Sequence, residues 1–87
     1  MNNLSHHKSG PIEFFERKGH GEIEVVLLHG IGSNALSFES LIKELPDSWR
    51  LIAWNAPGYG DSKPLKPDWP IAEDYALALK NFFNRLK

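Results

Sequence analysis

The sequence contains no cysteine. Disulfides, thiolate zinc sites and cysteine nucleophiles are therefore excluded. The charges are nearly balanced, with 10 Lys and Arg against 11 Asp and Glu and a formal net charge of −1. This balance gives no electrostatic reason to expect a nucleic acid or an anionic membrane as partner. No apolar run approaches the roughly 20 residues that cross a bilayer.

The amino terminus is polar and lacks the apolar core of a signal peptide, so we expect a cytoplasmic protein. The chain has 87 residues, of which 41% are hydrophobic. Such a chain is one small globular domain or part of a larger one. A domain of this size buries only about 60% of the surface that its unfolded form exposes, which predicts marginal stability.

The most informative stretch is the apolar run Val25–Leu28, which ends in a Gly-rich turn over residues 29–34. An unbroken apolar run is typical of a strand buried on both faces of a parallel sheet. In open α/β sheets, ligands bind at the carboxyl ends of such strands. Gly30 and Gly32 permit backbone conformations that turn peptide N–H groups toward this crevice. We therefore expect the functional site at this turn.

The segments before this run predict a lead-in and a hairpin. Residues 1–10 are polar and are expected to be disordered, with His6 and His7 in a mobile tail rather than in a metal site. Residues 12–18 alternate between apolar and polar, which predicts a half-exposed edge strand. Only a short turn separates them from the strand 23–28, so the two strands are expected to pair antiparallel.

The segments after the turn predict a helix, a strand and a second helix. Ser33 or Asn34 can cap a helix over residues 35–45, and residues 49–54 form a second buried strand, parallel to the first. A Pro-rich loop leads to a helix over residues 71–86, and no further strand follows. The fold class is therefore α/β: residues 11–87 form an antiparallel hairpin leading into a βαβα unit of an incomplete, mostly parallel sheet.

One alternative function is dinucleotide binding. Gly30-Ile31-Gly32-Ser33-Asn34-Ala35 fits the pattern G-x-G-x-x-G/A between a strand and a helix. That fingerprint also requires an acid roughly 20 residues further on, to hold a ribose hydroxyl. Asn55 occupies this place, and the pattern is less well matched than the following one.

Two motifs resemble those of the α/β-hydrolase family. Leu27-Leu28-His29-Gly30 is similar to the His-Gly segment of the family, and the stretch from Asn55 to Ser62 is similar to its Asp-x-Pro-Gly-x-Gly-x-Ser signature. Each motif follows an expected strand. Asn55 departs from the usual Asp of the second motif, which weakens any charge-assisted hydrogen bond there.

The resemblance implies a role for His29, Gly30 and Ile31 in catalysis. In the family, backbone N–H groups stabilise the oxyanion formed during hydrolysis of an ester, lactone or similar small substrate, and one comes from this loop. The implied donor is the N–H of Ile31, with His29 fixing the loop by hydrogen bonding. The structural alternative is that Gly30 and Gly32 merely permit the turn. No cofactor or metal is implied.

The second motif is more plainly structural. Pro57, Gly58 and Gly60 set its backbone, while the side chains of Asp61 and Ser62 can bond to local N–H groups. Tyr59 is expected to pack within the protein rather than to face a substrate.

The sequence contains no G-x-S-x-G nucleophile motif and no later acid and histidine. We therefore expect an amino-terminal fragment of a hydrolase that is inactive alone and associates through an open sheet edge. A non-catalytic interaction module is the remaining alternative.

Overall fold

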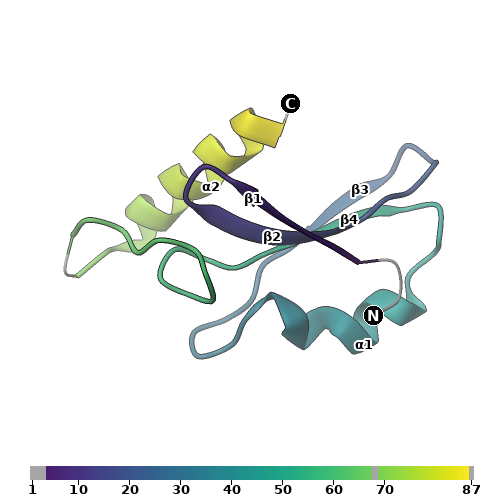
Figure 1. Ribbon diagram of the computed structural model, residues 1–87, viewed down its shortest axis with the longest axis horizontal. Coiled ribbons are helices and arrows are strands. Elements are labelled where there is room, and N and C mark those ends of the chain that lie inside the picture. Colours follow the sequence, from purple (N-terminus) through teal and green to yellow (C-terminus); the bar gives the residue numbers. More distant parts are fainter. Residues whose placement is uncertain (1–3, 68, 87) are drawn as a thin grey trace.

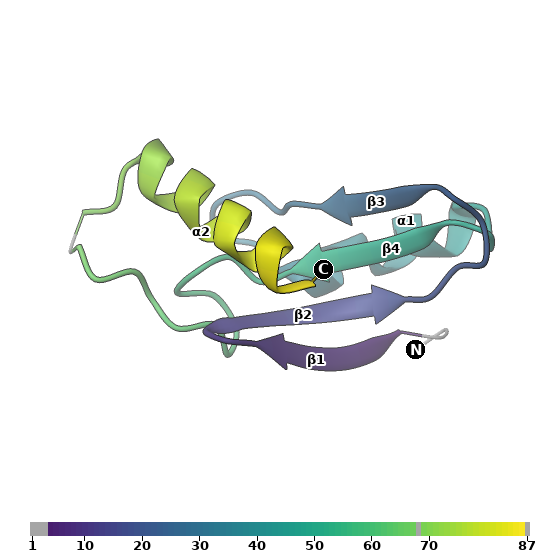
Figure 2. The ribbon, with the colours of Figure 1, turned by 90° about the horizontal axis from the view of Figure 1, so that it is seen from above.

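The computed structural model describes residues 4–67 and 69–86. In chain order its elements are β1 (Ser5–Ser9), β2 (Ile12–Arg17), β3 (Glu24–Leu27), the 3-10 helix η1 (Ala35–Phe38), α1 (Glu39–Glu44), β4 (Arg50–Trp54) and α2 (Ala72–Leu86) (Figure 1). The strands form one sheet in the order β1-β2-β4-β3, which Figure 2 shows from above. β2 is antiparallel to both of its neighbours, and β3 is parallel to β4. The predicted α/β class and parallel βαβ unit are confirmed.

The predicted pairing of residues 12–18 with 23–28 is wrong, because β4 lies between β2 and β3. The connection after β2 crosses the segment that enters β4, and the Gly21 N–H donates to the Ser48 carbonyl at 2.9 Å. At Gly19 a Cβ atom would collide with the backbone of Ser48 and Trp49. The two glycines of this connection therefore permit a close crossing of two chain segments, not a tight hairpin.

The predicted disordered lead-in also differs from the structure, in which Ser5–Ser9 form β1; residues 1–3 of that prediction lie outside the described residues. β1 pairs with β2 in the register His6↔Phe15 and His7↔Phe14. The His6 ring lies over the Phe15 ring with a centroid distance of 5.0 Å. The polar composition of β1 did not indicate a strand. Its backbone pairs with β2, and its polar side chains contact side chains of β2.

β2 is not the half-exposed edge strand that its alternating pattern predicts. Its polar residues Glu13, Glu16 and Arg17 are buried together with Ile12 and Phe14, and only Phe15 is half-buried. The Arg17 guanidinium donates to the carbonyls of Ile42 and Leu45 at the end of α1, at 2.9 and 3.3 Å, and also to the Pro46 carbonyl. Burial of these side chains is tolerated because each has hydrogen-bond partners, although Arg17 Nε is a buried atom without one among the described residues.

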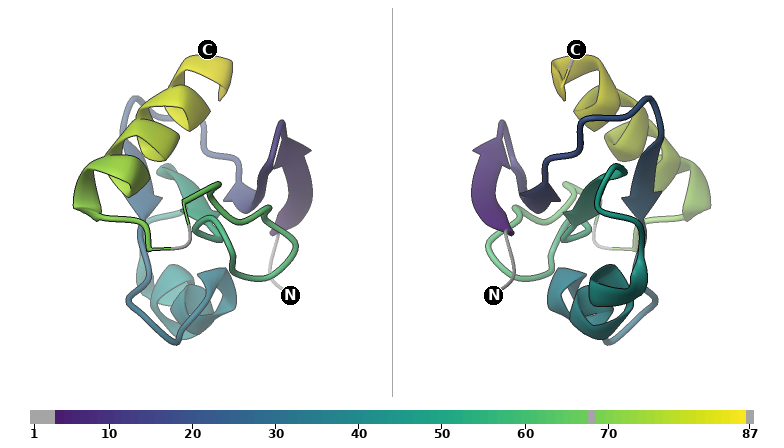
Figure 3. Two further views of the ribbon diagram at one scale, coloured as in Figure 1. Left: turned by 90° about the vertical axis from the view of Figure 1, so that its left-hand side faces the viewer. Right: turned by 90° about the vertical axis from the view of Figure 1, so that its right-hand side faces the viewer.

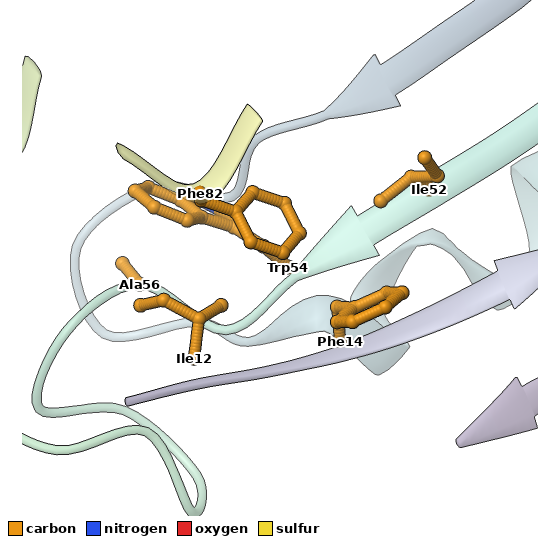
Figure 4. Packing of buried hydrophobic residues seen from close by; sticks show 6 residues of the cluster. All are labelled: Ile12, Phe14, Ile52, Trp54, Ala56 and Phe82. Atoms are coloured by element: carbon orange, nitrogen blue, oxygen red, sulfur yellow. The ribbon is translucent and has the colours of Figure 1, made fainter. Parts of the chain in front are cut away.

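The two α-helices lie on opposite faces of the sheet, as the end-on views of Figure 3 show. A hydrophobic core cluster lies on the α2 face. It contains residues of β2, β4, α2 and the turn after β4, shown in Figure 4: Ile12, Phe14, Ile52, Trp54, Ala56 and Phe82. Phe82 is fully buried and meets the Phe14 ring edge-on, with a centroid distance of 5.1 Å. Burying one such ring contributes about 1.5–3 kcal/mol, so this contact anchors α2.

The first helical segment begins as predicted but is tighter and shorter. The Asn34 side chain accepts a hydrogen bond from the Leu36 N–H at 2.9 Å, which confirms Asn34 as the N-cap. The segment starts as η1 and ends as α1 at Glu44, just before Pro46. The predicted helix over residues 71–86 is confirmed as α2. Among the described residues, no helix is long and apolar enough to cross a membrane.

Candidate functional site

Two turns meet at one edge of the sheet. The first covers residues 28–34 after β3, and the second covers residues 55–62 after β4. Because β3 and β4 are parallel neighbours, their carboxyl ends lie at the same edge. Figure 2 shows both turns at that end of the molecule. The structure thus brings together the two motifs that are separated in the sequence.

The first turn is closed by a hydrogen bond from the Ser33 N–H to the Gly30 carbonyl at 3.1 Å. Gly32 has φ +80° at the third position of this four-residue turn, a conformation typical of a type II turn that favours glycine. The Ile31 side chain is 99% exposed. Within residues 4–67 and 69–86, the Ile31 N–H has no hydrogen-bond partner. This donor is therefore available to a ligand.

His29 ties the first turn to the second. Its Nε2 accepts a hydrogen bond from the Ala56 N–H at 3.0 Å, and its Nδ1 lies 2.9 Å from the Gly30 carbonyl oxygen. A carbonyl only accepts, so these partners assign the proton to Nδ1 and the lone pair to Nε2. Both ring nitrogens are thus engaged in holding backbone groups.

Tyr59 forms the second link between the turns. Its ring meets the His29 ring edge-on, with a centroid distance of 4.8 Å. Its hydroxyl accepts a long hydrogen bond from the Gly32 N–H at 3.4 Å. Tyr59 packs within the protein, as expected, and it also lines the pocket described below.

Asn55 links the second turn to the start of η1. Its Oδ1 accepts a hydrogen bond from the Ala35 N–H at 2.8 Å, and its Nδ2 donates to Glu13 Oε1 at 2.6 Å. All three residues are buried. The amide at this position therefore serves one donor and one acceptor at once, which a carboxylate cannot do.

Glu13 of β2 gathers three donors around one carboxylate. Its Oε1 also accepts from the Asp61 N–H at 2.8 Å, and its Oε2 lies 2.6 Å from His6 Nε2. Burial raises the pKa of this carboxyl, but the hydrogen bonds from Asp61, Asn55 and His6 together hold the pKa below its ordinary value. Glu13 is therefore ionised at neutral pH.

Ser62 completes the connection to β2. Its hydroxyl accepts a hydrogen bond from the Glu13 N–H at 2.8 Å and donates to the Asn55 carbonyl at 2.6 Å. Gly60 has φ +51°, and a Cβ there would press on Asn55 and Glu13. The structural role expected for Gly60 and Ser62 agrees with this geometry. The Asp61 contribution comes from its backbone N–H.

A pocket of about 780 Å³ lies between the two turns and the start of α2. Its walls are mostly apolar and come from both turns, β4 and α2: Leu28, His29, Gly30, Ile31, Trp54, Ala56, Tyr59, Pro70, Ile71, Ala72, Tyr75, Ala76 and Leu79. Across the described part of the chain, no group of three or more His, Asp and Glu side chains could hold a metal ion. The geometry is that of a mostly apolar small-molecule pocket, and Ile31, whose N–H has no partner among the described residues, is in its lining.

Sequence reasoning located the two turns and missed the residue that joins them. Glu13 has no motif of its own, and its place beside Asn55 depends on the pairing of β2 with β4. The one available signal is Asn55 itself, because an amide in place of the usual Asp calls for an additional acceptor nearby.

Comparisons with known proteins agree with this architecture. Residues 24–87 match the family model described as alpha/beta hydrolase fold. Over 50 residues the chain is 40% identical to pimeloyl-[acyl-carrier protein] methyl ester esterase of Pectobacterium carotovorum, covering 58% of this chain and 20% of that enzyme. The enzyme of the same name from Neisseria meningitidis is 39% identical over 44 residues, covering 51% of this chain and 17% of the enzyme.

Two solved structures share the fold over nearly the whole chain. E-2-(acetamidomethylene)succinate hydrolase has a TM-score of 0.69 at 33% identity, covering 95% of this chain and 31% of the hydrolase. A membrane phospholipase A, a bacterial virulence factor, has a TM-score of 0.73 at 25% identity, covering 97% of this chain and 28% of the phospholipase. The chain spans about a fifth of the length of the curated relatives it matches. The family model covers most of the chain, which therefore belongs to the α/β-hydrolase fold family.

Proposed function

We propose that this chain supplies the oxyanion-stabilising loop of an ester hydrolase, as the amino-terminal portion of a longer protein. In this proposal the Ile31 N–H is one of the two backbone donors that hold the oxyanion. The observation that carries the proposal is that this N–H has no partner among the described residues, in a turn at the edge of an apolar pocket. The esterase relatives support the same reaction class.

The contacts of the turn support preorganisation of that donor. Three side chains accept hydrogen bonds from backbone N–H groups of the two turns and of η1. His29 accepts from Ala56, Tyr59 from Gly32, and Asn55 from Ala35. These contacts restrain the backbone on either side of Ile31. A donor that is already fixed stabilises developing negative charge without reorganising during the reaction. His29 serves in this proposal as a positioning residue, because both of its nitrogens are engaged with backbone groups.

The remaining chemistry comes from residues outside this sequence. In this reaction class a serine attacks the ester carbonyl, and the N–H following that serine is the second oxyanion donor. The pocket favours a small ester with an apolar acyl or alcohol group. The dinucleotide alternative has less support, because the Asn55 side chain is buried and is engaged by the Ala35 N–H and by Glu13.

Substitution of Ile31 by proline tests the proposal by removing one hydrogen. Ile31 holds the second position of its turn, where proline is favoured, so Ile31→Pro deletes the N–H with little change in the backbone. In the longer protein we expect kcat for ester hydrolysis to fall by about 10²–10³-fold. Ile31→Ala retains the N–H and is the matched control. Equal kcat values for the two variants would refute the role of this donor.

A further inference from the structure

The buried carboxylate of Glu13 has a specific relation to the first turn, although it lies on another strand. Its Oε1 accepts from Asn55 Nδ2 at 2.6 Å, and Asn55 Oδ1 in turn accepts from the Ala35 N–H at 2.8 Å. These partners fix the orientation of the Asn55 amide, since the Ala35 N–H requires an acceptor and the carboxylate requires a donor. By binding Nδ2, Glu13 orients the Asn55 amide so that Oδ1 faces the Ala35 N–H.

Ala35 is the first residue of η1, directly after the turn that contains Gly30 and Ile31. It is buried, and a buried N–H without an acceptor is strongly unfavourable. The hydrogen bond to Asn55 therefore determines where the turn ends and the helix begins. Asn34 holds the next donor, the Leu36 N–H, at 2.9 Å. These two hydrogen bonds anchor the carboxyl-terminal end of the turn that contains Ile31.

The choice of amide at position 55 depends on the acid at position 13. An aspartate at 55 would set two carboxylates at hydrogen-bond distance in a buried place, where both cannot remain ionised. With asparagine at 55, the Glu13 carboxylate accepts from Asn55 and from the Asp61 N–H through one oxygen. The two residues are therefore chemically matched.

We propose that Glu13 is a positioning residue for the oxyanion loop, acting through Asn55 on the Ala35 N–H. The same carboxylate holds the second turn through the Asp61 N–H, so one side chain sets the two turns relative to each other. This inference rests on the proposed function for its catalytic consequence. Its structural part, control of the Ala35 N–H, stands independently.

The test compares Glu13→Ala, Glu13→Gln and the control Glu22→Ala in the longer protein. Glu22 is exposed in the connection between β2 and β3. Hydrogen exchange of the Ala35 amide reports on the loop, and the Arg50 amide, which donates to the Ile23 carbonyl within the sheet, reports on the fold. Steady-state kinetics on a small methyl ester provide kcat and KM.

We expect Glu13→Ala to accelerate Ala35 exchange selectively and to lower kcat by up to about 100-fold, the effect of misplacing a catalytic group by about 1 Å, with little change in KM. Glu13→Gln retains an oxygen for both donors and should recover most of each loss. Unchanged Ala35 exchange, or equal acceleration at Ala35 and Arg50, would overturn the inference. So would an unchanged kcat in an active enzyme. A wild-type protein without esterase activity would contradict only the proposed function, and the exchange data would still decide the role of Glu13.

Discussion

His29 Nε2 accepts a hydrogen bond from the Ala56 N–H at 3.0 Å, and this bond joins the turns that follow the parallel strands β3 and β4. Ala56 is buried, so its N–H depends on this ring for a partner. The His-Gly motif of one turn thus stabilises the backbone of the other.

Replacing His29 by alanine should therefore destabilise the fold. The Ala56 N–H loses its acceptor, which costs about 1–3 kcal/mol for a buried group, and the edge-on contact with Tyr59 is lost as well. We expect a lower urea midpoint for His29→Ala, measured by tryptophan fluorescence on dilute protein. His20→Ala is the control, since His20 is exposed. Equal midpoints would show that water replaces the ring without cost.

Asn55→Asp should make stability depend on pH in the opposite sense to the wild type. The lowered pKa of Glu13 stabilises the wild type at pH values above the ordinary glutamate pKa, about 4.3, and this contribution is lost as the pH falls through the lowered value. In the variant, the carboxyl introduced at position 55 and that of Glu13 share one proton, so the pKa of the pair is raised. The contribution of this pair to the free energy of unfolding is then present at low pH, and it is lost as the pH rises through the raised pKa.

We expect the urea midpoint of Asn55→Asp to fall as the pH rises above the ordinary carboxyl pKa of about 4, whereas the Glu13 contribution in the wild type is fully present there. Asn81→Asp on the exposed side of α2 is the matched control for the change of charge. The same pH dependence in both variants would show that the effect is not due to the Glu13 contact.

The 87-residue chain alone should not hydrolyse a generic activated ester above background. It contains no serine in the G-x-S-x-G context, and its one histidine in the pocket has both nitrogens engaged. Release of 4-nitrophenol from its acetate ester is a direct measurement. Saturable turnover that persists through repurification would contradict this expectation and would point to His29 together with a nearby serine.

The isolated chain should also associate or unfold easily. β3 is the end strand of the described sheet, and its neighbouring apolar residues Ile23 and Leu28 are about half exposed. Unpaired strand edges of this kind promote pairing between chains. Sedimentation at several concentrations should show self-association, which Ile23→Lys at this edge should reduce. Leu77→Lys on α2 is the control. A dilute, monodisperse monomer with a sharp and reversible thermal transition would refute the prediction.

The sequence contained enough information to place the helices, the parallel strands β3 and β4, and the two turns. The apolar run over residues 25–28 indicated the strand β3, but the prediction that it is buried on both faces is wrong, because β3 is the end strand of the described sheet and is partly exposed. The apolar stripe of α2 has the helical periodicity that packing on one face produces. The positions of Asn34 and Pro46 likewise mark helix ends through local chemistry. These features depend on near neighbours along the chain, and that is why they could be predicted.

The errors concern how the strands pair. β2 looks amphipathic, but Glu13 and Glu16 are buried because β4 and the second turn supply their hydrogen bonds. β1 looks like a polar tail, but β2 provides it with a complete strand partner. The partners of Glu13 and Glu16 on β4 and in the second turn are distant in sequence, so no local pattern reveals them. The partner of β1 is the next strand along the chain, but the polar residues of β1 carry no apolar alternation that would indicate a hairpin. Gly30 and Ile31 remain predictions as catalytic groups.

The central place of β4 has a consequence for how the chain folds. β4 pairs with strands that both precede it, and the Arg50–Glu16 ion pair joins residues 34 positions apart. Long-range pairing of this kind slows folding, because loop closure reduces chain entropy before the contact forms. β1 and β2 can form a hairpin early, in which His6 already contacts Glu13, but the partners of Glu13 Oε1 and the Arg50 partner of Glu16 come only with residues 50–61. During synthesis, the emergence of β4 and its following turn is therefore the event that commits this sheet to its native order.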